Sequence, residues 1–147
     1  MRLIEPSTKA EVVGLPLEAL VTVKPNITPA GVEQLVTATG YSRFPVRADD
    51  HPSTGAGLIG YIHLADVLDT DPASRNRPVD RRCIRPLDDI PTTATLQTAL
   101  AALRRSGSHL ARLIDQNGQT RGLIALEDIL EQLVGEVADA TRRSRES

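Results

Sequence analysis

The sequence predicts an α+β fold of two repeated units, each running helix, strand, hairpin, strand and helix, packed sheet to sheet with the helices outside. Two observations support this prediction. Two helical segments, 28–40 and 95–107, each begin at a threonine and end at a glycine, 67 residues apart. Each is followed by two short apolar strands joined by a polar turn. A unit of this size cannot bury both faces of its sheet alone, whereas two units can bury them against each other.

The offset between the repeats changes at only one loop. It falls from 67 to 62 residues after the hairpin, so that Gly60 matches Gly122 and Asp66 matches Asp128. The difference lies in the polar loop 49–57, where changes of length are tolerated. The two halves therefore share one pattern rather than a general likeness of composition.

In the first half, helix and strand signals follow each other directly. Thr28 is expected to cap a helix, with Pro29 at its first position and Gly40 at its end. Strands are expected over 43–47 and 58–62, and a short helix over 63–68.

The second half repeats this order. Thr95 is expected to cap a helix that Gly107 ends. Residues 110–114 and 122–125 are predicted strands around the turn 115–118, whose Asn-Gly pair tolerates positive φ angles. A longer helix follows, with an unbroken apolar stripe: Leu126, Ile129, Leu130, Leu133, Val134 and Val137.

These elements divide the chain into five segments. They are a lead-in over 1–11, a first repeat over 12–70, an arginine-rich linker over 71–85, a second repeat over 86–138 and a charged tail over 139–147. The linker contains five arginines and two prolines but few apolar side chains, which favours an exposed connector. A partner or phosphate site in the same arginine cluster is the alternative.

The composition excludes several classes of function. The chain has 147 residues, a net charge of −2 and no Trp, and its aromatic residues are Phe44, Tyr41 and Tyr61. A nucleic-acid binder needs basic charge and stacking rings, so this class is disfavoured. Cys83 is alone, so no internal disulfide forms and a reducing compartment is expected. No apolar run reaches the roughly 18 residues of a membrane span.

No catalytic or metal-binding motif stands out. His51, His63, His109 and Cys83 lack metal-ligand spacing, and no Ser, Cys or Lys lies in a nucleophile motif. The segment 55–60 matches a dinucleotide-binding pattern, but a loop precedes it and a strand follows it, where the motif requires a strand and a helix. Neither an enzyme nor a metal centre is expected.

Four stretches carry a resemblance to a known family. They are Gly-Tyr-Ser-Arg-Phe-Pro-Val (40–46), Gly-Tyr-Ile-His-Leu-Ala-Asp-Val-Leu (60–68), His-Leu-Ala (109–111) and Leu-Glu-Asp-Ile-Leu-Glu-Gln-Leu-Val-Gly-Glu (126–136). Two copies of a glycine-ended helix, a strand and a Gly-apolar-apolar-x-x-x-Asp string resemble a tandem pair of cystathionine-β-synthase (CBS) domains, a Bateman module. The longer strings are similar to the CorC/HlyC type, hemolysin-like membrane proteins related to the CNNM cation transporters. The resemblance covers residues 12–138.

The resemblance implies a regulatory module. In that family the CBS pair is cytoplasmic and follows a membrane domain, so this chain is expected to be a soluble fragment of a protein in the cell membrane that transports a divalent cation such as magnesium. The expected partners are a second copy of the chain in a homodimer, the membrane domain of the parent protein and a small-molecule nucleotide. The expected ligand is an adenine nucleotide, ATP or AMP, with Mg²⁺, sensed through the geometry of the dimer. A ligand-free structural dimerisation module is the alternative.

The nucleotide site of the family maps onto both repeats. Asp66 and Asp128 stand where the resemblance places the ribose-binding aspartate, three residues after the expected helix caps His63 and Ala125. A carboxylate there also suits the positive end of a helix, which is a purely structural reason for it. Neither cap residue has the small hydroxyl usual in the family, and this departure favours the ligand-free alternative.

Arg112 stands in the second repeat where the first has Pro45. It is either an edge-strand arginine reaching solvent or a side chain that lines the cleft and pairs with a ligand phosphate. Its fixed charge favours the second repeat, because His63 is mostly neutral at pH 7.5. Glu127 opposes a polyphosphate unless Mg²⁺ or Arg112 offsets its charge. The candidate nucleotide-binding residues are Asp128, Arg112, His109, Ala125 and Thr95 in the second repeat, and Asp66, His63, Pro45 and Thr28 in the first. For His109, a packing role is the alternative.

Overall fold

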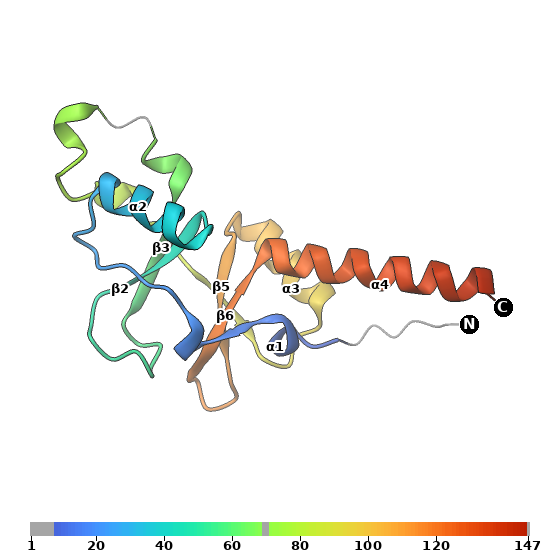
Figure 1. The fold of residues 1–147 in the computed structure, drawn as a ribbon. Helices are drawn as coiled ribbons and strands as arrows, with labels where there is room; N and C mark the ends of the chain where they lie inside the picture. Colours follow the sequence, from blue (N-terminus) through green and yellow to red (C-terminus); the bar gives the residue numbers. More distant parts are fainter. Residues whose placement is uncertain (1–7, 69–70, 147) are drawn as a thin grey trace. The chain divides into compact units, whose positions relative to one another are not determined.

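The computed structural model describes residues 8–68 and 71–146, which form two compact units (Figure 1). The first-repeat unit is Glu18–Leu87. The second-repeat unit combines the chain up to Leu17 with the chain from Asp88 onward. Each unit has its own hydrophobic core.

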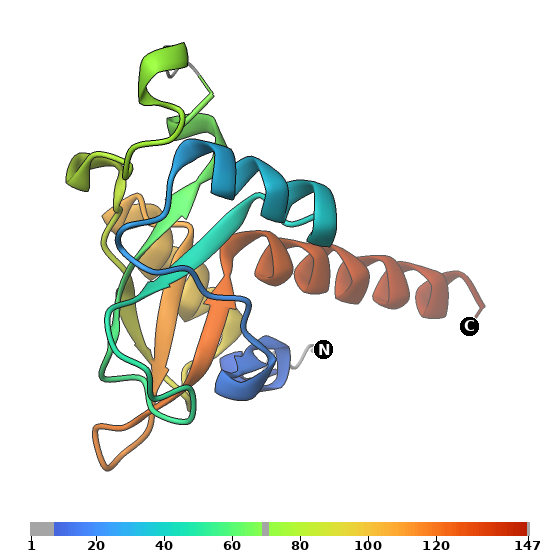
Figure 2. The same ribbon diagram turned by 60° about the vertical axis from the view of Figure 1, so that its left-hand side comes forward.

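The first-repeat unit is a helix packed on a hairpin (Figure 2). Helix α2 (Pro29–Thr39) packs on the antiparallel strands β2 (Arg43–Arg47) and β3 (Leu58–His63). Its core contains Phe44 and Val46 from β2, Ile62 from β3 and Val32 from α2. The caps are those that the sequence predicts: the Thr28 side chain accepts from the Gly31 N–H at 3.0 Å, and Gly40 is left-handed at φ 79°. Both ends of α2 are therefore determined locally.

The short helix predicted over 63–68 is wrong. Only a single 3₁₀ turn, η2 (Leu64–Asp66), follows β3. Val67 is the one fully buried side chain in this segment, and Leu68 is 60% exposed. Leu64 and Val67 pack on the core of the first-repeat unit but Leu68 does not, so nothing holds a further turn, and isolated helical turns are unstable in water.

Most of the 71–85 segment is exposed, but part of it packs on the first-repeat unit. It contains two 3₁₀ turns, η3 (Pro72–Ser74) and η4 (Arg81–Cys83). Val79 between them is buried, and its N–H donates to the carbonyl of Ile27. At its end, Arg85 forms an antiparallel bridge with Tyr61 of β3.

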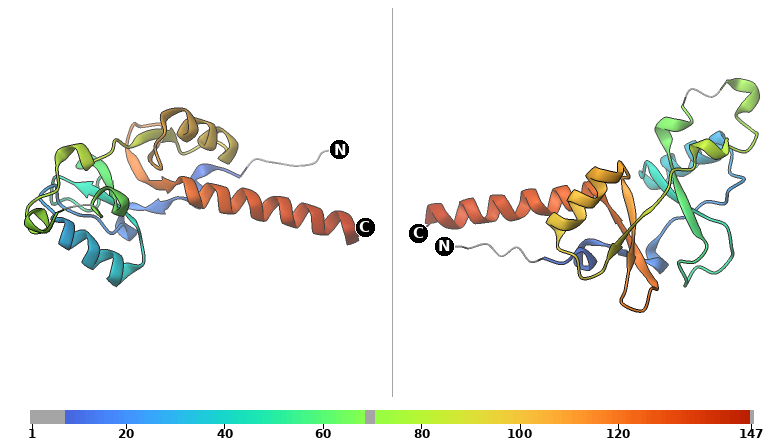
Figure 3. Two further views of the ribbon diagram at one scale, coloured as in Figure 1. Left: turned by 90° about the horizontal axis from the view of Figure 1, so that it is seen from above. Right: turned by 180° about the vertical axis from the view of Figure 1, so that it is seen from behind.

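The second-repeat unit contains a four-stranded sheet in the order β1-β6-β5-β4 (Figure 3). Strand β1 (Leu15–Pro16) follows helix α1 (Ala10–Val13), and β4 (Asp88–Pro91) runs parallel to β5 (Leu110–Ile114). Strand β6 (Thr120–Ala125) lies antiparallel to both β1 and β5. Helices α3 (Leu96–Ser106) and α4 (Leu126–Glu146) supply the rest of the core. Within residues 8–68 and 71–146, no helix combines the length and apolar character that crossing a bilayer requires.

The strand registers confirm the internal repeat. Arg43 lies opposite His63 in the first hairpin, and their equivalents Leu110 and Ala125 lie opposite each other in the second. The registers shift after Val46 in one hairpin and after Leu113 in the other, which are equivalent positions. Residues related by the offsets of 67 and 62 therefore occupy equivalent strand positions in the two hairpins.

The two repeats exchange their flanking segments. Leu15 lies at the start of the first repeat in sequence, yet it pairs with Leu123 of β6 in the second-repeat unit. Arg85 precedes the second repeat, yet it pairs with Tyr61 of β3 in the first-repeat unit. Since Tyr61 and Leu123 are equivalent, Leu15 and Arg85 occupy equivalent places. Residues 12–17, which the sequence assigns to the first repeat, thus pack in the second-repeat unit.

Candidate functional site

Asp66 is held by an arginine in the first-repeat unit. Its two carboxylate oxygens accept from Arg85, Oδ2 from Nε at 2.7 Å and Oδ1 from Nη2 at 2.6 Å. This bidentate, charge-assisted pair is the strong form of a salt bridge. The hydrogen bond from Arg85 lowers the pKa of Asp66 below its usual value, and the same bond raises the pKa of Arg85. Asp66 is therefore ionised and engaged.

The backbone fixes the position of Arg85. The Tyr61 N–H donates to the Arg85 carbonyl at 2.9 Å, and the Arg85 N–H donates to the Tyr61 carbonyl at 2.8 Å. Asp66 ends the 3₁₀ turn that follows the same strand. The pair thus joins two segments that the β3 ladder already places side by side.

Asp128 occupies the equivalent place in the second repeat but is in a different state. It is the third residue of α4 and is half-buried. Among the residues that the structure describes, no hydrogen bond to its side chain is found. Burial raises its pKa, and the nearby carboxylates of Glu131 and Glu127 raise it further. A partly desolvated carboxylate without a donor is costly, so it is available to a ligand that brings donors.

The exchanged segments explain this difference. The residue beside Leu123 in the second-repeat unit is Leu15, whereas the residue beside Tyr61 in the first is Arg85. A leucine has no donor to offer Asp128.

Arg112 is not an edge-strand residue, contrary to one of the two sequence interpretations. Strand β5 lies between β6 and β4, and Arg112 stands opposite Asp89 of β4. Its Nε donates to Asp89 Oδ1 at 2.7 Å. Ala111 and Leu113, the neighbours of Arg112 along the strand, belong to the core under the helices, so Arg112 lies on the other face of the sheet.

Four candidates of the second repeat gather at one corner of its sheet. Leu110 pairs with Ala125, so His109 and Ala125 adjoin, and the His109 carbonyl accepts from the Leu126 N–H at 2.9 Å. Asp128 follows within the first turn of α4. Arg112 lies opposite Leu123, two residues before Ala125.

Thr95 lies elsewhere in that unit. Its hydroxyl accepts from the Thr98 N–H at 3.2 Å and so caps α3. Thr95 forms an antiparallel β-bridge with Lys9. The neighbour of Lys9, Thr8, donates a hydrogen bond to Glu136, which lies about two turns along α4 from Asp128. Thr95 therefore has a structural role at a helix start.

The remaining first-repeat candidates also have structural contacts. Thr28 caps α2, and the buried Pro45 accepts from the Val23 N–H at 2.9 Å. His63 ends β3 and makes no side-chain cap to the 3₁₀ turn that follows. The first repeat forms the same backbone corner, because the Ser42 carbonyl accepts from the Leu64 N–H at 2.8 Å, but its aspartate, Asp66, is engaged by Arg85.

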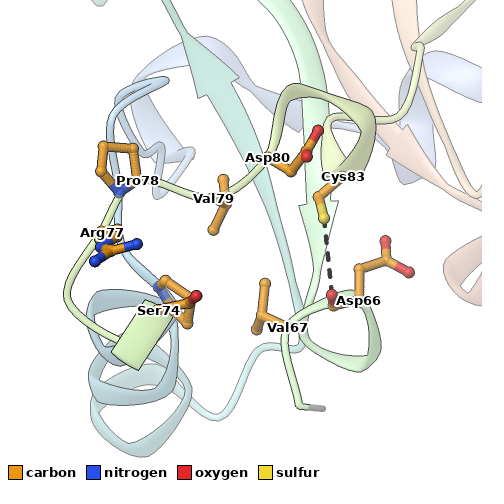
Figure 4. A pocket seen from close by; sticks show the side chains of 9 residues that line it. Asp66, Val67, Ser74, Arg77, Pro78, Val79, Asp80 and Cys83 are labelled. Carbon is orange, nitrogen blue, oxygen red and sulfur yellow. Dashed lines mark hydrogen bonds between the residues drawn. The ribbon is translucent and has the colours of Figure 1, made fainter. Parts of the chain in front are cut away.

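A pocket of about 280 Å³ lies in the first-repeat unit, beside the 71–85 segment for which the sequence leaves a partner or phosphate site as the alternative to an exposed connector (Figure 4). Its lining comes from α2, η2 and the 71–85 segment: Pro29, Asp66, Val67, Ser74, Arg77, Pro78, Val79, Asp80 and Cys83. The Cys83 thiol lies 3.7 Å from the Asp66 carbonyl, and burial raises its pKa. The Asp66 carboxylate points away from the pocket, in the direction of the arginine bond. No group of His, Cys, Asp or Glu able to hold a metal occurs among residues 8–68 and 71–146.

Comparisons with known proteins agree with this architecture. A CBS-domain family model matches residues 83–135. The CBS domain of a bacterial CNNM/CorC family Mg²⁺ transporter, solved in complex with ATP, is 26% identical with a TM-score of 0.73, covering 88% of this chain and 89% of that one. The CBS domain of a putative transporter from Clostridium difficile 630 is 25% identical with a TM-score of 0.73, covering 88% and 96%.

Two curated relatives extend the comparison. An uncharacterized protein of Mycobacterium tuberculosis is 43% identical over 116 residues, covering 79% of this chain and 32% of the relative. A UPF0053 protein of Bacillus subtilis is 30% identical over 131 residues, covering 88% of this chain and 28% of the relative. The chain thus spans about a third of the length of the curated relatives that it matches.

Two repeats of helix and hairpin, an aspartate after each hairpin and the family match together define a tandem CBS-domain pair. Its fold and sequence are similar to the CBS domain of a bacterial CNNM/CorC family protein.

Proposed function

We propose that this CBS pair is the regulatory module of a CorC-like membrane transporter for a divalent cation, magnesium, and that it binds an adenine nucleotide at the second-repeat corner, defined as His109, Arg112, Ala125 and Asp128. The observation that supports this most directly is Asp128, a half-buried carboxylate with a raised pKa and no hydrogen-bond donor among the described residues. A ribose offers two hydroxyl donors that match its two oxygens.

The residues of the corner fit the other parts of a nucleotide. The N–H groups at the start of α4 have no partners within their own helix, and they favour an anionic phosphate. Arg112 stands on the adjacent strand, opposite Leu123 and two residues before Ala125, and its permanent charge is held by a salt bridge to Asp89. Glu127 in the same helical turn opposes a polyphosphate, which favours a ligand with few phosphates or one that carries Mg²⁺.

Ala125 cannot supply the hydroxyl that the family resemblance places at the cap. The arginine offsets this loss, because a guanidinium bond to phosphate is stronger than a neutral hydroxyl bond. The ATP complex of a CNNM/CorC CBS domain that is 26% identical to this chain supports the ligand class.

Regulation requires that the ligand favours one arrangement of the assembly over another. The chain offers an assembly surface on α4, where Leu130 is 38% exposed, Val134 67% and Val137 66%. These three side chains, the α4 stripe, lie on one helix face at positions i, i+4 and i+7. We infer that two copies of the chain pack through the α4 stripe as a homodimer.

Titration calorimetry with ATP and AMP, with and without Mg²⁺, tests the nucleotide site. Asp128→Asn is expected to weaken binding on the order of 30-fold, because the ribose hydroxyls lose a charged acceptor. Asp139→Asn removes a carboxylate from the exposed end of the same helix, where its exposed fraction is 61%, and is the matched control. Equal affinities of the two variants and the unmodified chain would contradict the site.

The α4 stripe also supports a second function, a structural dimerisation module without a ligand. The missing cap hydroxyl at Ala125 favours it. If titration calorimetry detects no nucleotide binding at millimolar concentration while light scattering shows a dimer, the structural dimerisation function holds instead.

A further inference from the structure

Each repeat has an aspartate at the same position after its hairpin, yet only one of the two carboxylates is paired with an arginine. Asp66 and Asp128 both follow a hairpin of equivalent register. Asp66 has both oxygens on one guanidinium, whereas Asp128 has a raised pKa and no donor among the described side chains. The difference therefore comes from outside the repeated motif.

The two aspartates differ because a different segment of the chain pairs with the second strand of each hairpin. Arg85 and Leu15 are equivalent, because each lies antiparallel to the second strand of a hairpin, at Tyr61 and Leu123. The glycines that precede Tyr61 and Leu123 confirm that Arg85 and Leu15 are equivalent. A Cβ on Gly60 would collide with the Arg85 carbonyl, and a Cβ on Gly122 with the Leu15 carbonyl.

The Arg85 pair competes with a sugar for Asp66. A ribose hydroxyl is a neutral donor, and it competes for Asp66 with two charge-assisted bonds from one rigid fork. The backbone bonds to Tyr61 hold the Arg85 main chain in place, so a ribose can reach the Asp66 oxygens only if the guanidinium gives up both of its bonds to them. The Asp66 side chain is also only 21% exposed.

We propose that Arg85 closes the first repeat to nucleotides and so makes the CBS pair a one-site module, with Leu15 as the residue that leaves the second repeat open. Residues outside the two repeated aspartate motifs then determine which repeat binds a nucleotide. The inference rests on the proposed function for its ligand, but the closure of Asp66 can be tested separately.

The test exchanges the two equivalent residues, with Mg²⁺-ATP as the probe and calorimetric stoichiometry as the readout. The unmodified chain is expected to bind one ATP. Arg85→Leu, which installs the residue of the other repeat, is expected to bind two. The added site is expected to disappear in Arg85→Leu/Asp66→Asn. Leu15→Arg is expected to weaken ATP binding at least tenfold, because the new guanidinium reaches Asp128.

Arg82→Leu is the matched control. It removes the same charge from the same segment, but Arg82 is 91% exposed and pairs with Asp80. Its expected stoichiometry is one. A thermal melt of each variant identifies any that fail to fold, and for such a variant Arg85→Gln replaces Arg85→Leu.

The outcomes separate this inference from the proposed function. If the unmodified chain binds no ATP but Arg85→Leu binds one in an Asp66-dependent way, the second-repeat site fails and the closure by Arg85 stands. If a folded Arg85 variant gains no Asp66-dependent site, or if the unmodified chain already binds two ATP, the closure is overturned.

Discussion

Arg85 donates from Nε and Nη2 to the two carboxylate oxygens of Asp66, at 2.7 and 2.6 Å, across 19 positions of the chain. In the second-repeat unit the residue equivalent to Arg85 is Leu15, and Asp128, the equivalent of Asp66, has no such donor among the described residues. One motif is thus in two electrostatic states, and this contrast has consequences for stability as well as for binding.

Asp66→Asn is expected to destabilise the chain at pH 7 by about 1 kcal/mol, since a partly exposed bidentate pair is lost. Because the folded state lowers the pKa of Asp66, its stabilisation is present above the unfolded pKa of about 3.9 and is lost as the pH falls below it. Thermal unfolding from pH 3 to 7 measures this. The gap between the melting temperatures of the variant and the unmodified chain should narrow as the pH falls below about 4, and a gap that stays constant from pH 7 to pH 3 would contradict the assignment.

Asp128→Asn is expected to act in the opposite direction. The folded state raises the pKa of Asp128, so the charged form costs stability at neutral pH, and this cost is absent below its unfolded pKa. The amide should raise the unfolding free energy at pH 7 by roughly 0.5 kcal/mol, after the lost helix-dipole interaction is subtracted. Chemical denaturation at pH 7 checks the sign. A loss of stability would show that Asp128 has a structural partner.

Gly60→Ala and Gly122→Ala are each expected to destabilise the chain by about 2 kcal/mol. In both cases the added methyl would meet a backbone carbonyl, of Arg85 or of Leu15, which cannot rotate away. Gly135→Ala is the control, because its Cβ meets nothing within 4 Å and it lies inside α4. There alanine should stabilise by about 0.5–1 kcal/mol through its helix propensity. Urea titrations of the three variants give the comparison.

Val134→Lys is expected to disrupt the homodimer, because it places a charge in the middle of the α4 stripe, where Val134 is 67% exposed. Gln132→Lys adds the same charge about 160° away around the helix and should leave the dimer intact. Light scattering at tens of micromolar distinguishes 16 kDa monomers from dimers. If the unmodified chain is itself monomeric at that concentration, the dimer assignment is wrong.

Arg112→Ala is expected to weaken ATP binding about tenfold at both pH 6 and pH 8, since the guanidinium charge does not titrate in this range. His63→Ala tests the first repeat in the same assay, where a histidine contact to phosphate would be stronger at pH 6. If His63→Ala removes binding while Arg112→Ala preserves it at both pH values, the site is in the first repeat.

Much of the fold could be predicted from local sequence. The Thr28 and Thr95 caps and the left-handed glycines Gly40 and Gly107 are the predicted helix ends. The Asn-Gly turn closes the second hairpin with Gly118 at φ 79°. Where sequence reasoning failed, tertiary packing was the reason: only Leu64 and Val67 of the 63–68 segment reach the core, and the partner of Arg112 lies in a different strand.

The sequence by itself determined the two repeats, their register and the equivalence of Asp66 and Asp128, because caps, turns and strand alternation depend on neighbouring residues. Only the tertiary structure decided that Asp66 is engaged and Asp128 is not. That outcome depends on the exchange of flanking segments, which brings Leu15 to β6 and Arg85 to β3. Pairing between strands that are distant in sequence depends on which sheet edges remain unpaired once the core has folded. The spacing of residues along the chain therefore does not predict it.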